Sequence, residues 1–365
     1  MTTPSEPPDD GRGEAELLDE ESLAAELVDG DAPDHGLRRR REHSRPVAIA
    51  LKVVPYAFVA AMVLYLFSRR DDLAKLGDAS IQDLVLIGAL VVVGAVLNAT
   101  EYWVMYRAAD IDVGFRENVA LFNAGQLGNY LPMQVGTMYR FRYLKVVHRL
   151  RYANTASFLL MNLALTFGST AICGLLGLAV LAVNEQADPS WLLVVGFVLL
   201  FALSIASALM PLPKRSEPGG RLMRAWAEFH NGWENVRRQP RVAFEVLLID
   251  TVKLVFLAWR FAVAFHILGI DAPIGVYLVV APVTALVTVL APTPGSLGIR
   301  EGAVAVVVKL LGYSIPTGLL AATIDRVVML VVACVLGSLG YFVTGRRLRA
   351  ARARDAAGAP VTSPG

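Results

Sequence analysis

The pattern of apolar and polar residues along the chain is dominated by long hydrophobic runs that charged residues seldom interrupt. Six runs are long enough to cross about 30 Å of hydrocarbon as helices, which takes about 20 residues each. Because lipid offers the backbone no hydrogen bonds, such runs span a membrane as helices. The pattern therefore predicts an all-α polytopic membrane protein. The expected spans are Val47–Phe67, Leu84–Tyr106, Thr155–Val183, Trp191–Leu209, Val242–Leu268 and Pro316–Val343.

Composition and charge agree with this prediction and add an orientation. Hydrophobic residues make up 55% of the chain, a share that soluble domains rarely reach. Basic residues gather in alternate loops, which predicts six full crossings with both termini in the cytoplasm of a cell-membrane protein. Residues 1–45 are expected to be an acidic, disordered tail with a basic end, because residues 1–36 hold twelve Asp or Glu. The membrane domain is expected at 46–345 and a basic, disordered tail at 346–365.

One segment between the second and third expected spans is apolar but broken. Residues 115–147 are flanked on both sides by basic residues, so both flanks are expected on the cytoplasmic side. The segment is predicted either to enter the membrane and return or to lie along its surface. Its interruptions are Gly125, Gly128, Asn129, Pro132 and Gly136.

A second broken segment, residues 276–311, precedes the last expected span. Its pattern predicts two short half-helices joined by a corner at residues 291–298, where Pro294 lacks a backbone donor and Gly295 and Gly298 permit a sharp turn. The backbone groups freed at such a corner must be buried in protein or line a wet cavity.

The two breaks share a spacing, because Pro132 is followed by Gly136 as Pro294 is by Gly298. Two re-entrant segments entered from opposite sides are typical of an inverted-topology repeat, in which the substrate site lies between the interrupted helices. The alternative is that these residues interrupt unrelated membrane helices, where Pro and Gly are also frequent.

Four charged residues lie in or after the second corner. Arg300 and Glu301 open the second half-helix, whose N-terminus attracts anions, so Arg300 is a candidate for binding a lipid phosphate. Asp325 and Arg326 lie about ten residues into the last span, where a charge needs a partner. The preferred pair is Arg326 with Glu301. The alternatives are a helix cap, a snorkelling arginine and a purely structural ion pair.

Further charged residues are candidates for a polar interior or for ion pairs. Asp250 and Lys253 are three residues apart on one helical face and are expected to pair, whereas Arg260 has no local partner. Glu101 is a candidate for lining a cavity. Arg140, after the first corner, is predicted to attract an anionic headgroup or, alternatively, to serve only the cytoplasmic charge bias.

At the two corners the chain resembles the flippase-like transmembrane domain of the lysylphosphatidylglycerol synthase family. The resemblance is carried by residues 129–140 and, more specifically, by residues 291–303 followed by Arg326. It departs where Thr137 replaces a frequent Glu, and where Met161 and Asn162 occupy the place of a common Arg and acid. The resemblance implies translocation of a lipid, such as an anionic or aminoacylated phospholipid or an isoprenoid-linked lipid. It implies no lysyl transfer, since no soluble synthase domain is expected.

The sequence contains no recognisable catalytic or cofactor-binding motif. No metal-ligand spacing, phosphate-binding glycine loop or catalytic grouping stands out, so no cofactor, metal or nucleic-acid partner is expected. The leading hypothesis is a lipid translocase that binds phosphate through Arg300, Arg326 and Arg140. One alternative is a membrane-embedded lipid-modifying transferase, for which Glu301 is the candidate acid or base. Another is a membrane partner of a separate lipid synthase or glycosyltransferase.

Overall fold

The computed structural model describes residues 80–130, 135–150, 152–184, 190–209, 230, 233–234, 238–290 and 294–356. The first expected span, the N-terminal tail and Pro132 lie outside these residues. The described part of the chain is helical and contains no strand, as the sequence predicts. Its elements are α4 (Ile81–Ala108), α5 (Phe115–Gly128), α6 (Val135–His148), α7 (Tyr152–Val183), α8 (Trp191–Leu209), α10 (Pro240–Ile267), α11 (Ile274–Leu290), the 3₁₀ turn η5 (Pro294–Ser296), α12 (Ile299–Leu310) and α13 (Ile315–Ala356).

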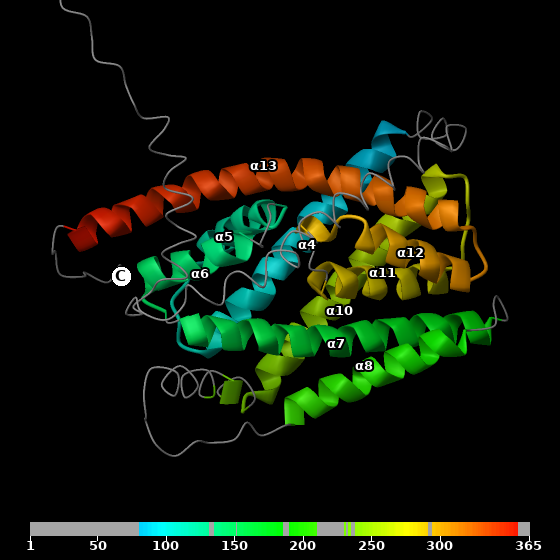
Figure 1. Cartoon of the computed structure of the whole chain (residues 1–365), viewed down its shortest axis with the longest axis horizontal. Helices are drawn as coiled ribbons and strands as arrows, with labels where there is room; N and C mark the ends of the chain where they lie inside the picture. Colours follow the sequence, from blue (N-terminus) through cyan, green and yellow to red (C-terminus); the bar gives the residue numbers. More distant parts are fainter. Residues whose placement is uncertain are drawn as a thin grey trace, which may run out of the picture. The chain divides into compact units, whose positions relative to one another are not determined.

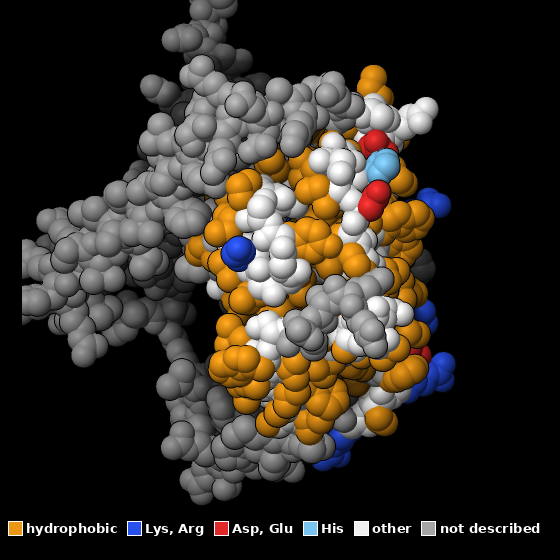
Figure 2. All heavy atoms as spheres, turned by 90° about the vertical axis from the view of Figure 1, so that its right-hand side faces the viewer, with side chains coloured by type: hydrophobic (Ala, Val, Ile, Leu, Met, Phe, Trp, Pro, Cys, Tyr) orange, Lys and Arg blue, Asp and Glu red, His pale blue; other side chains and the backbone are white. Residues whose placement is uncertain are grey.

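The distribution of side chains is that of a membrane protein, with apolar groups outside and charges inside. On α8, Leu199 is 63% exposed, whereas Glu101, Glu301 and Asp325 are fully buried. Figure 2 shows hydrophobic side chains over most of the described surface on one side of the molecule, with few charges among them. Among the described residues, α4, α7 and α13 contain segments that are long and apolar enough to cross a bilayer. A polar surface on these helices would have been expected in water.

Both broken segments form helical hairpins, and the hairpins start from opposite ends of α10 (Figure 1). At the first end, Gln239 precedes α10 and donates a hydrogen bond of 2.9 Å to Ala108 O, at the end of α4. The α5–α6 hairpin follows directly. At the other end, the Phe265 ring packs against Tyr277 in α11 and Tyr313 just after α12. The predicted pair of broken segments, each made of two short helices joined at a corner, is therefore confirmed.

The tips of the two hairpins meet. Gly295 N–H donates a hydrogen bond of 2.8 Å to Asn129 O, which joins η5 to the end of α5. A Cβ atom on Gly295 would lie 2.6 Å from the ring of Tyr130, so the approach requires glycine. The two corners, 166 residues apart at this hydrogen bond (295 − 129), therefore form one structural unit.

The packing of the helices has the regularity that a duplicated unit would produce. Helix α5 packs along α13, helix α11 packs along α7, and α4 packs against α10. If α4, α5 and α7 are exchanged for α10, α11 and α13 in that order, the contact between α5 and α13 becomes the contact between α11 and α7. The contact between α4 and α10 is unchanged by this exchange. Together with hairpins that enter from opposite ends, this exchange supports the predicted inverted repeat.

The C-terminal boundary requires a correction. Residues 346–356 were expected within a disordered tail, but α13 continues through them to Ala356. Alanine and arginine make up most of this stretch, and both are strong helix formers, so an established helix propagates through it at little cost. The first half-helix also begins slightly earlier than expected, at Ile274, whereas the second begins directly after the expected corner, at Ile299.

Candidate functional site

The second corner places three residues with positive φ angles, Gly295, Ser296 and Gly298, at the tip of the α11–α12 hairpin. Gly295 and Gly298 have positive φ angles of 57° and 79°, a region that glycine enters without steric cost. Gly298 then starts α12, and its N–H donates a hydrogen bond of 2.8 Å to Glu301 Oε2. Glu301 therefore caps the helix that it belongs to, as one of the alternative interpretations held.

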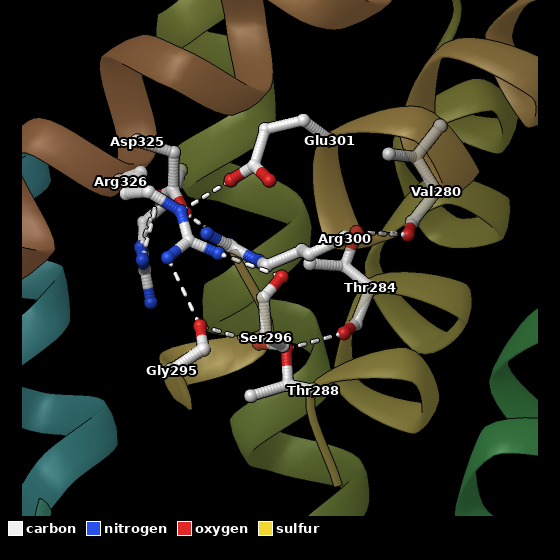
Figure 3. A network of polar contacts seen from close by, with 10 residues as sticks. Val280, Thr284, Thr288, Gly295, Ser296, Arg300, Glu301, Asp325 and Arg326 are labelled. Carbon is white, nitrogen blue, oxygen red and sulfur yellow. Dashed lines mark hydrogen bonds and ion pairs between the residues drawn. The ribbon is translucent and has the colours of Figure 1, made fainter. Parts of the chain in front are cut away.

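Arg326 on α13 braces this corner. Its Nε donates to Glu301 Oε1, which is the ion pair preferred from the sequence. Its two terminal nitrogens donate to Gly295 O at 2.9 Å and Ser296 O at 3.3 Å. Figure 3 shows the guanidinium between Glu301 and the turn. Arg326 thus satisfies the carbonyl groups that the broken helix leaves without partners.

Arg300 and Arg260 share a single carboxylate, that of Asp325. Arg300 Nη2 pairs with Asp325 Oδ2, and Arg260 Nε lies 2.7 Å from Asp325 Oδ1. The three residues come from α12, α10 and α13, so each long-range partner is supplied by a different helix. The sequence left Arg260 without a partner because its partner lies 65 positions away in the chain.

This corner cluster, defined as Arg260, Arg300, Glu301, Asp325 and Arg326, carries three positive and two negative charges. All five residues are buried, with Arg300 only 2% exposed. Arg300 Nη1 has no hydrogen-bond partner in the described part of the chain. A buried net positive charge with a free guanidinium donor is unfavourable unless an anion completes it. The geometry is suited to a phosphate or another oxyanion, which guanidinium groups bind strongly.

In the described part of the first corner, the turn is closed by neutral hydrogen bonds. Asn129 Oδ1 accepts hydrogen bonds from Thr137 N at 3.0 Å and Thr137 Oγ1 at 3.3 Å. Gly136 packs against Gly125 so closely that an added Cβ would lie 1.7 Å from Gly125 O. Thr137, which replaces an acid frequent in the family, therefore serves here to close the turn.

Arg140 does not contact the corner cluster through any of its described interactions. Its guanidinium stacks on the Tyr102 ring, 4.1 Å from the centroid, and lies 5.1 Å from that of Phe122. The aromatic faces stabilise the cation and bury its stem. Arg140 therefore belongs to the α4–α5–α6 packing rather than to a common site with Arg300 and Arg326.

A second buried cluster lies between α4, α7 and α10. Lys253 Nζ lies 2.8 Å from Glu101 Oε1 and 3.1 Å from Asn98 Oδ1. It also pairs with Asp250, the ion pair expected from their spacing. Ser169 on α7 donates to the other oxygen of Asp250. We call Asn98, Glu101, Ser169, Asp250 and Lys253 the central cluster. Glu101, which had no expected partner, is thus placed in it.

A third cluster, around Glu117, was not predicted from the sequence. Glu117 in the first turn of α5 accepts a hydrogen bond from Tyr143, lies 2.9 Å from His148 Nε2 and pairs with Arg347 of α13. Burial opposes ionisation, but the bonds from His148 and Tyr143 and the charge of Arg347 lower the pKa of Glu117 to about 2. Sequence position alone gave no signal, because Glu117 looks like an ordinary acid at a helix start.

The candidate acid or base of the transferase hypothesis is already engaged. Both oxygens of Glu301 accept hydrogen bonds, one from Gly298 N–H and one from Arg326. A general acid or base must reach the substrate with a free oxygen. Among the described residues, no group of three or more His, Cys, Asp or Glu is arranged to hold a metal ion.

Comparison with known proteins gives a family. The family model described as "Lysylphosphatidylglycerol synthase TM region" matches residues 47–337. This range contains the hairpins, the corner cluster and the central cluster. The search of curated proteins gave no match.

Proposed function

The chain belongs to the family of the lysylphosphatidylglycerol synthase TM region, which connects it with membrane lipids, and from this premise we propose that it is a lipid translocase. Its substrate is a lipid with an anionic phosphate in the headgroup, including aminoacylated phospholipids and isoprenoid-linked lipids. It works in the cytoplasmic membrane with both termini in the cytoplasm.

The observation that carries the proposal is the net positive corner cluster at the meeting point of two re-entrant hairpins. Arg300 offers the free donor Nη1, and Arg260 lies on the other side of the shared Asp325. These two residues contact the headgroup phosphate in our proposal. Arg326 was expected to bind phosphate as well as to pair with Glu301. In our proposal it braces the turn, because its donors already hold Glu301 and the carbonyl groups of the turn.

The position of the cluster supports movement rather than simple binding. The α5–α6 hairpin starts at one end of α10 and the α11–α12 hairpin at the other, and their tips meet beside the arginines. A small displacement of either hairpin would expose the anion site to one side of the membrane or the other. Broken helices that meet near the membrane midplane serve this purpose in transporters.

The test is a translocation assay with purified, full-length protein in liposomes. Fluorescent phosphatidylglycerol is followed across the bilayer with a membrane-impermeant quencher, and aminoacylated, zwitterionic and isoprenoid-linked lipids are compared with it. The wild-type protein is expected to accelerate exchange of a phosphate lipid over protein-free liposomes. The Arg300→Gln variant is expected to be slower by about tenfold or more, because a charge-assisted hydrogen bond contributes about 1.5–3 kcal/mol.

The matched control is Arg241→Gln, on the exposed first turn of α10, where the side chain is 90% exposed and pairs only with Glu245. It should translocate at the wild-type rate. Arg260→Gln provides a second site variant if Arg300→Gln folds poorly, as judged by thermal unfolding. Absence of acceleration for every lipid class, or an Arg300→Gln rate equal to that of the control, would refute the proposal.

A further inference from the structure

The central cluster has an excess of acidic groups, whereas the corner cluster has an excess of basic groups. It contains the carboxylates of Glu101 and Asp250 and one ammonium group, that of Lys253. With all three ionised it carries two negative charges and one positive charge. Glu101 and Asp250 are 0% and 1% exposed. A net negative charge at this depth is costly, and a single bound proton removes it.

Two carboxylate oxygens of the cluster, Glu101 Oε2 and Asp250 Oδ1, are buried without a hydrogen-bond partner in the described part of the chain, but Asp250 Oδ1 lies in the ion pair with Lys253. Glu101 Oε1 accepts from Lys253, but Oε2 is buried without a hydrogen-bond partner in the described part of the chain. An orphaned carboxylate oxygen is unfavourable, whereas a protonated carboxyl group has less need of partners and can itself donate. Asp250 differs, because its Oδ2 accepts from Ser169 in addition to its pairing with Lys253. Glu101 is therefore the member of the cluster that takes the proton.

Groups on two neighbouring helices face this site. From α10 it is faced by Asp250 and Lys253, and on α7 the Cys173 thiol lies close enough to Asp250 to sense its charge. Helix α7 also presents Asn162, whose Oδ1 is buried without a partner and whose amide donates to Tyr102 at 3.4 Å. The protonation of Glu101 thus depends mainly on its own cluster and on the field of the corner cluster.

The two clusters are close enough to affect one another. Lys253 and Arg260 are seven residues apart on α10, which places them about 10 Å apart along the axis on the same face. Two unit charges at about 10 Å and an effective dielectric constant of about 20 change each other's binding about tenfold. An anion at the corner cluster neutralises the positive charge that stabilises ionised Glu101. Proton binding at Glu101 in turn leaves the positive charge of the corner cluster uncompensated.

We propose that Glu101 is a proton-binding site coupled to the anion site, so that a proton binds to Glu101 Oε2 when a lipid phosphate binds beside Arg300. The inference rests on the proposed function for its anion. The proton comes from water and returns to water, and no covalent bond of the lipid changes. A transporter built in this way moves an anionic lipid together with a proton, and a pH difference across the membrane drives the lipid toward the alkaline side.

The experiment measures protons and lipid together. Short-chain phosphatidylglycerol, whose phosphodiester keeps one negative charge over the whole range, is titrated into full-length protein in weakly buffered detergent with a pH indicator. Its affinity is measured at several pH values by calorimetry. The wild type is expected to take up about half a proton per bound lipid at pH values where Glu101 titrates, and to bind about tenfold more tightly as pH falls. The variants are Glu101→Gln and the matched control Glu245→Gln, whose carboxylate lies in the exposed pair with Arg241.

The possible results distinguish a failure of proton coupling at Glu101 from a failure of lipid binding at the corner cluster. Glu101→Gln is expected to bind the lipid with no proton uptake and with an affinity that no longer changes with pH, while Glu245→Gln behaves as wild type. Wild-type binding without proton uptake overturns the coupling and leaves the lipid site intact. Wild-type protein that binds no lipid overturns both. Because the wild type alone decides these last two cases, poor folding of Glu101→Gln does not protect the inference. An infrared band of a protonated carboxyl group that appears with lipid and is absent in Glu101→Gln confirms the assignment.

Discussion

The two corners are closed by different chemistry in the part of the chain that the structure describes. In the first, Asn129 and Thr137 close the turn with neutral hydrogen bonds, and glycine packing brings α5 and α6 together. In the second, Arg326 and Glu301 close the turn with buried charges, and Arg300 and Arg260 surround Asp325 beside it. Both arrangements satisfy the backbone groups of a broken helix. Among the described residues of the two corners, the charged arrangement alone leaves a net charge and a donor without a partner, neither of which a purely structural turn requires.

This difference distinguishes residues that only stabilise a turn from residues that are also available to bind a ligand. Charges inside a membrane are expensive, and the described residues of the first corner close their turn with neutral hydrogen bonds in the same molecule. The second corner therefore retains its charges for a reason other than closing the turn. Substitutions at one corner, or at the contacts beside it, should therefore change stability at both corners but lipid binding only at the second.

The largest effect is expected for Arg326→Gln. The substitution leaves Glu301 as an unpaired buried charge and frees the carbonyls of Gly295 and Ser296, so it should destabilise the protein by about 5 kcal/mol. Thermal unfolding in detergent measures the loss. The double variant Glu301→Gln with Arg326→Gln should be more stable than the single one, because no charge remains unpaired. Equal stability of single and double variants would contradict the bracing role.

A smaller loss is expected for Asp325→Asn, and it should be reversible by ligand. Arg260 and Arg300 both lose their counter-ion, which costs about 3 kcal/mol, and the corner cluster gains one further positive charge. Phosphatidylglycerol should therefore raise the melting temperature of Asp325→Asn more than that of the wild type, since ligands stabilise the state they bind. Asp271→Asn, with a 99% exposed side chain, is the control. An equal shift for both variants would show that no anion binds at the corner.

Glu117→Gln tests the contacts that fix the base of the first hairpin to α13. It should cost about 1–3 kcal/mol, because Tyr143, His148 and Arg347 lose a charged acceptor. The pKa of Glu117 is lowered to about 2 in the folded protein, from about 4.3 in an unfolded chain. Its contribution is therefore complete above about pH 4.3 and is lost as the pH falls toward 2. The stabilities of wild type and Glu117→Gln should converge over that interval, and parallel curves would contradict the assignment.

The sequence predicted the architecture because its strongest signals are local. Runs of apolar residues define the helices from α4 to α13, and Pro and Gly define the corners at the residues where the hairpins turn. It also predicted the pair Asp250–Lys253, whose two residues lie within one turn of a helix. The pair Arg326–Glu301 could be predicted because a charged residue inside a membrane needs a partner of opposite charge.

The sequence missed what depends on long-range packing. Arg260 meets Asp325 only because α10 packs against α13, and Glu117 meets Arg347 across 230 positions. Arg140 was grouped with the other arginines because charge was the only visible property, whereas its surroundings in the fold are the aromatic rings of Tyr102 and Phe122. Which of several buried charges pair is decided by helix register in space, and no local pattern encodes that register.

The smallest effect, and the most direct test of the comparison, is expected for Thr137→Val. The substitution keeps the shape of the side chain and removes only the hydroxyl bond to Asn129, so it should cost about 1 kcal/mol. The backbone bond from Thr137 N to the same oxygen remains, and the corner should keep its turn. Thr137→Ser, which retains the hydroxyl, is the control. Lipid translocation should be unchanged in both, because the first corner supplies no charge to the anion site. A Thr137→Val variant that folds normally but fails to translocate would show that the neutral corner also contacts the substrate, and the division of labour between the corners would then be wrong.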